Sequence, residues 1–172
     1  MAGIIWIIVA LIILFVAIVF GVTMLFGAAF VPSHRLQTRQ AFKKLKPLTK
    51  KDVLVDFGCG NGVVLEEAIK NGAGRAIGIE LNPFLAILAH VMNHKNERIK
   101  IKCGNMTKVK LPEDMTVAYI FGLKKVMKKL KPVLERYAKE HGRTIWVISL
   151  AFKFNGMKSI KSYGSYWLYK IE

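Results

Sequence analysis

The chain has 172 residues, enough for one folded domain, and it carries a formal net charge of +16. Its two cysteines have no Cys-x-x-Cys or His spacing, which argues against a metal site, and they need not pair in a reducing compartment. The excess of positive charge favours an anionic partner, either lipid headgroups or nucleic acid.

The first thirty residues are predicted to be a retained transmembrane anchor. No charged side chain occurs from Met1 to Ser33, and the apolar run from Gly3 to Phe26 exceeds the roughly 20 residues that cross a bilayer. A cleaved signal peptide is the alternative, with a cleavage site near residues 27–29. However, no Lys or Arg precedes the run, and it is longer than the roughly 7 to 15 residues of a signal core.

Residues 31–51 are predicted to be a basic juxtamembrane segment. They hold 7 basic side chains and no acid. The positive-inside rule then places the rest of the chain in the cytoplasm as part of a single-pass membrane protein, and it favours lipid headgroups over nucleic acid as the anionic partner. Within the segment, Ser33 is a candidate N-cap for an amphipathic helix over residues 34–45, expected to lie at the headgroup level. A solvated linker is the alternative.

Residues 52–172 alternate between strand and helix patterns, which predicts an α/β fold. The expected architecture is a doubly wound, Rossmann-like, mostly parallel sheet with a C-terminal antiparallel hairpin. Pro132 is expected either to break the last helix or to lie in the first turn of a new one. The helix after the second strand is expected to bury Leu85, Leu88, Ala89 and Met92. The strands are predicted at 53–57, 76–80, 99–103, 115–121 and 143–152, the helices at 62–70, 82–93 and 124–141, and the hairpin at 157–163 and 166–171.

A glycine-rich turn follows the first strand. Asp56 closes the apolar run, and glycines follow at positions 58, 60 and 62 before the helix pattern begins. The turn is not a dinucleotide fingerprint, because the sixth position counted from Gly58 is Val63, and it lacks the Gly-Lys-Ser/Thr ending of a phosphate loop. We expect the glycines to let the backbone approach a ligand and the helix N-terminus to present free N–H groups to it.

A second acid follows at the end of the next strand. Glu80 lies 24 residues after Asp56. An ionised carboxylate there can accept two hydroxyl hydrogen bonds from a ribose in a bidentate way.

Together these motifs resemble those of class I S-adenosylmethionine-dependent methyltransferases. More narrowly, the apolar N-terminal run, the Phe30-Val-Pro-Ser33 segment and the Gly78-Ile-Glu-Leu-Asn-Pro83 motif resemble small membrane-anchored protein-lysine methyltransferases related to the mitochondrial enzyme that modifies ATP synthase subunit c. The resemblance implies S-adenosylmethionine as the cofactor. It also implies that Asn61 and Asn105 stand where the family has acids. Asn105 would contact the adenine amine, and recognition of adenine would lose a charge but keep an acceptor. The implied cofactor-binding residues are Asp56, Gly58, Cys59, Gly60, Gly62, Glu80, Leu81, Asn82, Asn105 and Met106.

The resemblance implies a lysine of a membrane protein as the methyl acceptor. A phospholipid amino headgroup is the alternative substrate, and a non-catalytic cofactor-binding module is the third possibility. Nucleic acid is disfavoured, because residues 119–123 lack both the Asp-Pro-Pro-aromatic motif of amino-group enzymes and the Pro-Cys of cytosine C5 enzymes. No catalytic base is identified, since the four histidines (His34, His90, His94 and His141) lie outside the motif loops.

Overall fold

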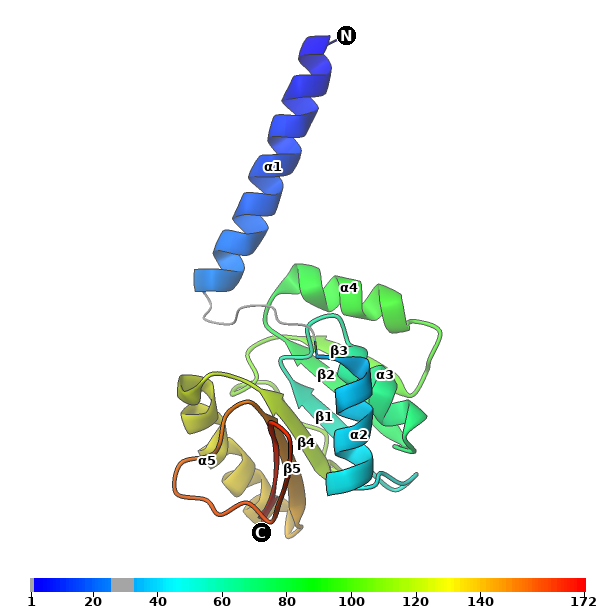
Figure 1. The fold of residues 1–172 in the computed structure, drawn as a ribbon, viewed down its shortest axis with the longest axis vertical. Coiled ribbons are helices and arrows are strands. Elements are labelled where there is room, and N and C mark those ends of the chain that lie inside the picture. The colour runs from blue at the N-terminus through cyan, green and yellow to red at the C-terminus, as the bar shows by residue number, and fades with distance from the viewer. Residues whose placement is uncertain (1, 26–32) are drawn as a thin grey trace. The chain divides into compact units, whose positions relative to one another are not determined.

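The computed structural model describes residues 2–25 and 33–172 (Figure 1). The chain divides into two compact units, Met1–Val31 and Pro32–Glu172. The alternative cleavage site at 27–29 and most of the Phe30-Val-Pro-Ser33 segment lie outside the described residues.

The first unit contains one helix, α1 (Ala2–Leu25), whose sequence has no charged residue. Its described large apolar side chains are exposed; Trp6, for example, is 72% exposed. No helix in the described part of the chain is both long enough and apolar enough to qualify as a membrane span. The helix is therefore present, but the predicted transmembrane span over residues 1–30 is not supported.

The second unit contains eleven elements, and they follow the predicted order. Its helices are α2 (Arg35–Leu45), α3 (Val63–Lys70), α4 (Pro83–Asn93) and α5 (Lys124–His141). Its strands are β1 (Val53–Phe57), β2 (Arg75–Glu80), β3 (Ile99–Cys103), β4 (Val117–Phe121), β5 (Ile145–Leu150), β6 (Lys161–Tyr163) and β7 (Tyr166–Ile171).

The strands form a seven-stranded sheet in the order β3-β2-β1-β4-β5-β7-β6. Neighbours from β3 to β5 pair in parallel, whereas β7 pairs antiparallel with both β5 and β6. The doubly wound, mostly parallel sheet with an antiparallel C-terminal hairpin is thus confirmed.

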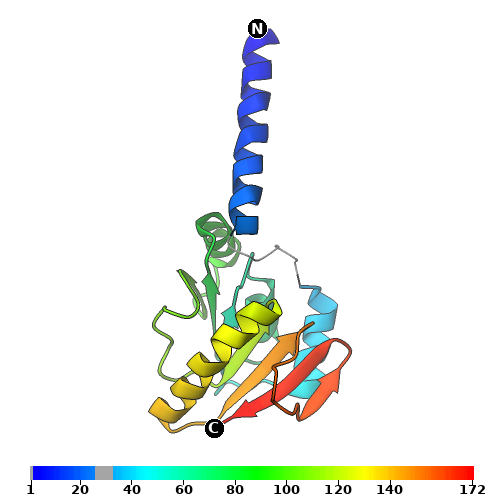
Figure 2. The same cartoon turned by 90° about the vertical axis from the view of Figure 1, so that its left-hand side faces the viewer.

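Helices cover both faces of the sheet, so the sheet is buried and its central strands are almost entirely apolar. One core cluster joins α2 and α3 to the sheet through Phe42, Leu65 and Tyr119, and Ala89 of α4 belongs to it. The other joins α5 to the opposite face through Leu130 and Leu134. Figure 2 shows α5 and α2 on opposite sides of the sheet.

Helix α2 packs as part of the domain core. The helix starts as predicted, but its N-cap is His34, which makes no side-chain capping bond. Its inner face, Thr38, Ala41, Phe42 and Leu45, is buried. The protein's own core therefore covers the apolar face of this helix. Its predicted place at the headgroup level, with its lysines toward phosphates, stays a prediction.

Two further helix predictions are corrected. Pro132 lies inside α5 without ending it, because buried residues on both sides, Leu130 and Leu134, pack the helix against the sheet. In α4 the buried residues are Ala86 and Ala89. Small side chains allow α4 to approach the sheet closely, and the larger Leu88 and Met92 remain outside, 44% and 53% exposed.

Candidate cofactor site

The two predicted acids lie on adjacent central strands. Asp56 of β1 is a register partner of Gly78 on β2, and Glu80 ends β2 two residues later. The strand order reverses direction between β1 and β4, and in open α/β sheets ligands bind outside the carboxyl ends of the strands at such a point. The fold therefore places both acids at the expected ligand-binding edge.

The glycine loop turns through left-handed backbone conformations that glycine tolerates. The φ values of Gly58, Gly60 and Gly62 are 98°, 53° and 83°. The N–H groups of these loop glycines are hydrogen-bonded within the protein. The N–H groups of Gly58 and Cys59 both donate to the carbonyl of Ile79, at 2.8 and 3.1 Å, and that of Gly62 donates to Cys59. These backbone donors fix the shape of the loop against β2.

Glu80 links the loop to the second strand. Its Oε2 accepts the N–H of Gly60 at 2.9 Å, and its Oε1 accepts the N–H of Asn82, also at 2.9 Å. A carboxylate oxygen has two lone-pair directions, so each oxygen keeps one for a further donor. The 9% exposed Glu80 thus fits two ribose hydroxyls in a bidentate arrangement.

Asp56 is a buried acid next to Glu80. Its side chain is 2% exposed, and burial, followed by the nearby negative charge of Glu80, raises its pKa well above the ordinary value of 3.8. No basic side chain in the described part of the chain pairs with either acid. A cationic ligand would therefore stabilise the ionised form of Asp56, and the sulfonium and amino groups of S-adenosylmethionine meet this requirement.

Asn82 caps α4 and leaves one donor unused. Its Oδ1 accepts the N–H groups of Phe84 and Leu85, at 2.9 and 3.4 Å. Its Nδ2 is buried without a hydrogen-bond partner among the described residues. A buried amide donor without a partner beside Glu80 is a further feature that a bound ligand would satisfy. Leu81, which lies between Glu80 and Asn82 in the sequence, is half-buried.

The two cofactor-binding residues predicted after β3, Asn105 and Met106, lie in different surroundings. Met106 lies beside the glycine loop, since its Cε is 3.8 Å from the position that a Cβ on Gly58 would take. Asn105 is exposed, and its Oδ1 accepts both the N–H and the hydroxyl of Thr107, at 2.9 and 2.8 Å. In this structure the oxygen therefore organises its own turn, and contact between Asn105 and adenine stays a prediction.

Cys59 faces the protein core. It is 5% exposed, and burial raises the pKa of its thiol, so it remains protonated and takes no part as a nucleophile. A Cβ on Gly78 would lie 2.4 Å from its sulfur. Cys59 thus contributes to the loop by packing over Gly78, and only its backbone can approach a ligand.

Tyr119 is a buried polar side chain in register with Asp56 that the sequence pattern did not indicate. It lies on β4 and is 1% exposed, and its buried hydroxyl lacks a hydrogen bond of ordinary geometry in the described structure. Burial, and next the neighbouring Tyr166, raises its pKa well above the ordinary value, so the hydroxyl keeps its proton. The available signal was one polar aromatic side chain in an otherwise apolar central strand.

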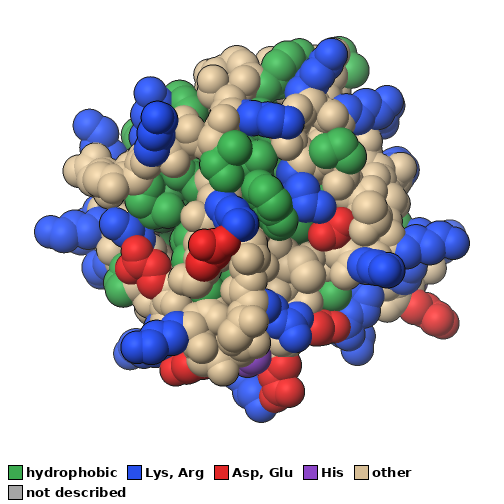
Figure 3. Space-filling view, turned by 90° about the horizontal axis from the view of Figure 1, so that it is seen from below, with side chains coloured by type: hydrophobic (Ala, Val, Ile, Leu, Met, Phe, Trp, Pro, Cys, Tyr) green, Lys and Arg blue, Asp and Glu red, His purple; other side chains and the backbone are tan. Residues whose placement is uncertain are grey.

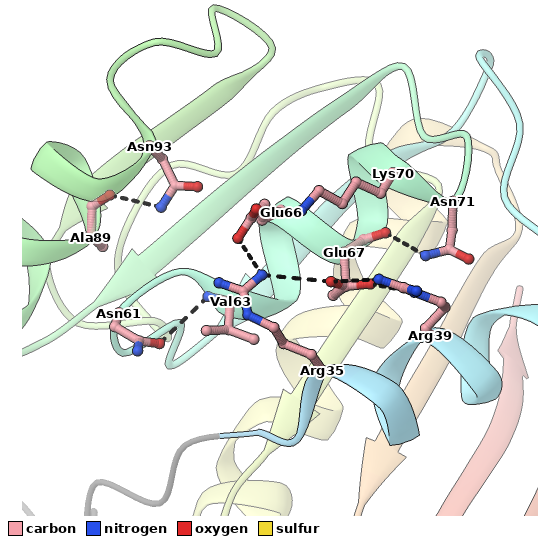
Figure 4. A network of polar contacts seen from close by, with 10 residues as sticks. All are labelled: Arg35, Arg39, Asn61, Val63, Glu66, Glu67, Lys70, Asn71, Ala89 and Asn93. Atoms are coloured by element: carbon pink, nitrogen blue, oxygen red, sulfur yellow. Dashed lines mark hydrogen bonds and ion pairs between the residues drawn. The ribbon is translucent and has the colours of Figure 1, made fainter.

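Ion pairs brace the helix that follows the loop (Figure 4). The Glu67 side chain on α3 is fully buried and forms a two-pronged contact with Arg39 of α2, at 3.0 and 3.3 Å. Arg35 pairs with Glu66 and lies 3.5 Å from Glu67. Because α3 begins at Val63, directly after the loop, these pairs join α2 to the rear of the candidate site.

Comparison with known proteins decides the family. The model of the ANTKMT methyltransferase domain matches residues 56–161, more than half of the chain. The chain belongs to this family. The resemblance to class I methyltransferases is thereby confirmed, and S-adenosylmethionine is the cofactor of the domain.

Two curated relatives are ribosomal protein L11 methyltransferases. The one from Pseudoalteromonas atlantica is 31% identical over 144 residues, covering 79% of this chain and 47% of the relative. The one from Mannheimia succiniciproducens is 36% identical over 93 residues, covering 52% of this chain and 31% of the relative. The chain thus spans at most about half the length of these relatives.

Solved structures share the fold at low sequence identity. An RNA methyltransferase from Salinibacter ruber in complex with S-adenosyl-L-homocysteine has a TM-score of 0.72 at 21% identity, covering 82% of this chain and 92% of that one. The Escherichia coli putative methyltransferase yhhF has a TM-score of 0.61 at 16% identity, covering 84% and 89%. These likenesses support the Rossmann-like fold.

Proposed function

We propose that this chain transfers a methyl group from S-adenosylmethionine to a lysine side chain of a membrane-associated protein. The proposal of methyl transfer rests on two buried acids beside the glycine loop, Asp56 and Glu80. This pair suits a cofactor that has a positive charge and a ribose. The proposal of a protein acceptor draws support from the two curated relatives, whose names give a ribosomal protein as substrate.

The cofactor supplies a methyl group on a cationic sulfonium, and the chain supplies alignment. The acceptor lysine must lose its proton, because its ordinary pKa is about 10.4. Burial and a cationic cofactor both disfavour the ammonium form, so the site can release this proton to solvent without a dedicated base. The neutral hydroxyl of Tyr119, in register with Asp56, is the group we propose to position the acceptor amine.

Membrane location is part of the proposal and rests on two features of the chain. The sequence from Met1 to Ser33 carries no charge, and the large apolar side chains of α1 from Ile4 to Leu14 are exposed. The following segment, residues 31–51, is basic, which by the positive-inside rule would place the folded domain in the cytoplasm as a single-pass membrane protein.

The test of the acceptor is methyl transfer in native membranes. Membranes containing the full chain are incubated with cofactor carrying a labelled methyl group, then separated into protein, lipid and nucleic-acid fractions. We expect label in protein, released as methyl-lysine on hydrolysis, and much less label with Glu80→Gln at a limiting concentration of cofactor. Label in lipid would instead identify a phospholipid amino headgroup as the acceptor, and binding without any transfer would leave a cofactor-binding module.

The test of location is extraction. The full chain should remain in the membrane pellet at high salt, and deletion of residues 1–28 should release a domain that still binds the cofactor. Release of the full chain by salt alone would rule out anchoring by α1. Modification of the exposed Cys103 by a membrane-impermeant reagent added from outside the cell would contradict the cytoplasmic orientation.

A further inference from the structure

Helix α4 presents an apolar face to solvent. Ile87, Leu88, Val91 and Met92 are 61%, 44%, 58% and 53% exposed. Their spacing places them on one side of the helix, opposite the buried Ala86 and Ala89. A continuous row of large apolar side chains on a helix of roughly 16 Å is a surface that water solvates poorly. Such a surface requires an explanation.

A basic hollow adjoins this row. It has a volume of about 260 Å³ and lies between α3 and the segment after α4. Met92 belongs both to the apolar face and to the wall of the hollow, while Lys70, Lys95 and Arg98 contribute positive charge to the wall. The apolar face and the cationic hollow are thus one continuous surface.

The positive charge of the hollow is only partly neutralised. Glu66 is its acid, and this carboxylate already pairs with both Arg35 and Lys70. Lys95 and Arg98 form no ion pair with any residue that the structure describes. The hollow therefore retains two uncompensated cations next to an apolar row, a combination that suits a ligand with an anionic head beside hydrocarbon.

We propose that the outer face of α4 and the basic hollow beside it form a docking surface for a bilayer rich in anionic phospholipid. The apolar side chains enter the interfacial layer, and Lys95, Arg98 and Lys70 contact lipid phosphates. The bilayer accounts for both features at once, since it supplies hydrocarbon and a layer of phosphates side by side. The net charge of +16 favours the same partner.

This surface lies close to the cofactor site. Helix α4 begins one residue after Asn82, whose N–H is held by Glu80. The inner side of α4 touches the glycine loop, because a Cβ on Gly62 would lie 2.6 Å from Nδ2 of Asn93. Docking through α4 would bring the mouth of the cofactor site to the lipid surface. The inference goes beyond methyl transfer and does not depend on it.

The experiment places a fluorescent probe on α4 of the full chain. Val91→Cys, in a Cys103→Ser background, is labelled with an environment-sensitive dye; Cys59 is buried and stays unlabelled. The protein is reconstituted into vesicles of phosphatidylcholine alone or mixed equally with phosphatidylglycerol. We expect a blue shift and protection from an aqueous quencher only with the anionic lipid. The same probe at the exposed Glu140→Cys on α5 should show neither.

The charge requirement is tested with matched variants. Lys95→Glu/Arg98→Glu should return the emission of the α4 probe to its value in water. Lys128→Glu/Lys129→Glu makes the same change of net charge on exposed positions of α5 and should leave the blue shift in place. Equal effects of the two pairs would show non-specific attraction and overturn the inference.

The remaining outcomes are also decisive. The inference would be overturned if the probes at 91 and 140 showed the same blue shift and the same protection from the quencher, or if the probe at 91 inserted into phosphatidylcholine alone. Protection in native membranes but not in protein-free vesicles would overturn it as well, in favour of a protein partner. In native membranes, which contain the candidate acceptors, docking of the probe without methyl transfer would reject the proposed activity and leave the docking surface standing.

Discussion

The carboxylate of Glu80 accepts the backbone N–H of Gly60 at 2.9 Å, so the end of β2 holds the loop that follows β1. Its other oxygen accepts the N–H of Asn82. One acid therefore fixes both chain segments that flank the candidate site, and it still offers one lone-pair direction on each oxygen. Loss of its negative charge should affect the shape of the site and its affinity together.

Glu80→Gln should weaken binding of S-adenosylmethionine on the order of 100-fold, because an amide has only one acceptor oxygen and turns its NH₂ toward one of the two backbone donors. Isothermal titration calorimetry measures this loss. Glu97→Gln, on an exposed residue, is the matched control and should bind normally. Unchanged affinity in Glu80→Gln would remove Glu80 from the site.

Asp56→Asn should stabilise the cofactor-free domain by about 1 kcal/mol, because it removes a buried charge next to Glu80. The same change should lower the affinity for S-adenosylmethionine. The folded state raises the pKa of Asp56 and so binds its proton more tightly than the unfolded chain does. This group's contribution to stability is therefore full at low pH and lost as pH rises from 3.8 through the raised pKa. Denaturant titrations at a series of pH values should show that the free energy of unfolding falls less steeply with pH in Asp56→Asn than in the unmodified protein.

The same ionisation predicts how affinity for the cofactor depends on pH. A cationic ligand binds the ionised form of Asp56 more tightly than the protonated form. Affinity for S-adenosylmethionine should therefore rise with pH as Asp56 loses its proton, over the same pH range in which the cofactor-free domain loses stability. S-adenosylhomocysteine, whose sulfur is uncharged, should show a weaker dependence. Identical pH profiles for the two ligands would argue against contact between the sulfonium and this acid.

Tyr119→Phe should leave stability within about 1 kcal/mol, because the hydroxyl that it removes makes no hydrogen bond of ordinary geometry. If Tyr119 positions the acceptor amine, kcat should fall roughly tenfold with the Kd of the cofactor unchanged. Steady-state kinetics together with calorimetry separate these effects. A loss of cofactor affinity with normal kcat would assign Tyr119 to cofactor binding instead.

Arg39→Ala should lower the Tm, because the buried carboxylate of Glu67 then keeps only Arg35 at 3.5 Å. Adding Glu67→Leu to Arg39→Ala should recover much of the lost Tm, since the unpaired buried carboxylate is then removed. Thermal unfolding by circular dichroism measures both variants. A double variant no more stable than Arg39→Ala would show that the ion pair does not account for the effect.

Gly78→Ala should destabilise the domain by about 1 to 3 kcal/mol, because the added Cβ would lie 2.4 Å from the sulfur of Cys59 and 2.8 Å from Cδ1 of Leu65. The collision moves Cys59 and with it the glycine loop, so cofactor affinity should fall too. Adding Cys59→Ala to Gly78→Ala should restore part of the stability and part of the cofactor affinity. Denaturant midpoints and calorimetry provide the readouts.

Strand and helix order could be predicted from the sequence because each central strand is an uninterrupted apolar run bounded by turn residues. The acid at the end of β2 was also predictable, since Glu80 is the only ionisable residue in an otherwise apolar segment from Ala76. The orientation of Asn105 was not, because its competing partner, Thr107, acts through a local turn rather than a periodic pattern.

The faces of the helices were predicted less well. A helical pattern identifies apolar positions, but it does not decide which of two apolar faces meets the sheet. In α4 the alanines pack inward and the larger residues lie outside, because close approach to the glycine loop leaves no room for Leu88 or Met92. For α2 the apolar face was recognised, but its partner, the C-terminal hairpin, is too distant in sequence to infer.

The C-terminal hairpin and α2 meet through side-chain contacts across more than a hundred residues. Tyr163 donates its hydroxyl to Gln40 at 2.7 Å, and the hydroxyls of Tyr166 and Thr38 lie 3.4 Å apart. During synthesis α2 emerges more than a hundred residues before these partners on the sheet. The core around Phe42 can therefore close only after β6 and β7 have been made, and a chain cut before them would leave Phe42 and its neighbours uncovered.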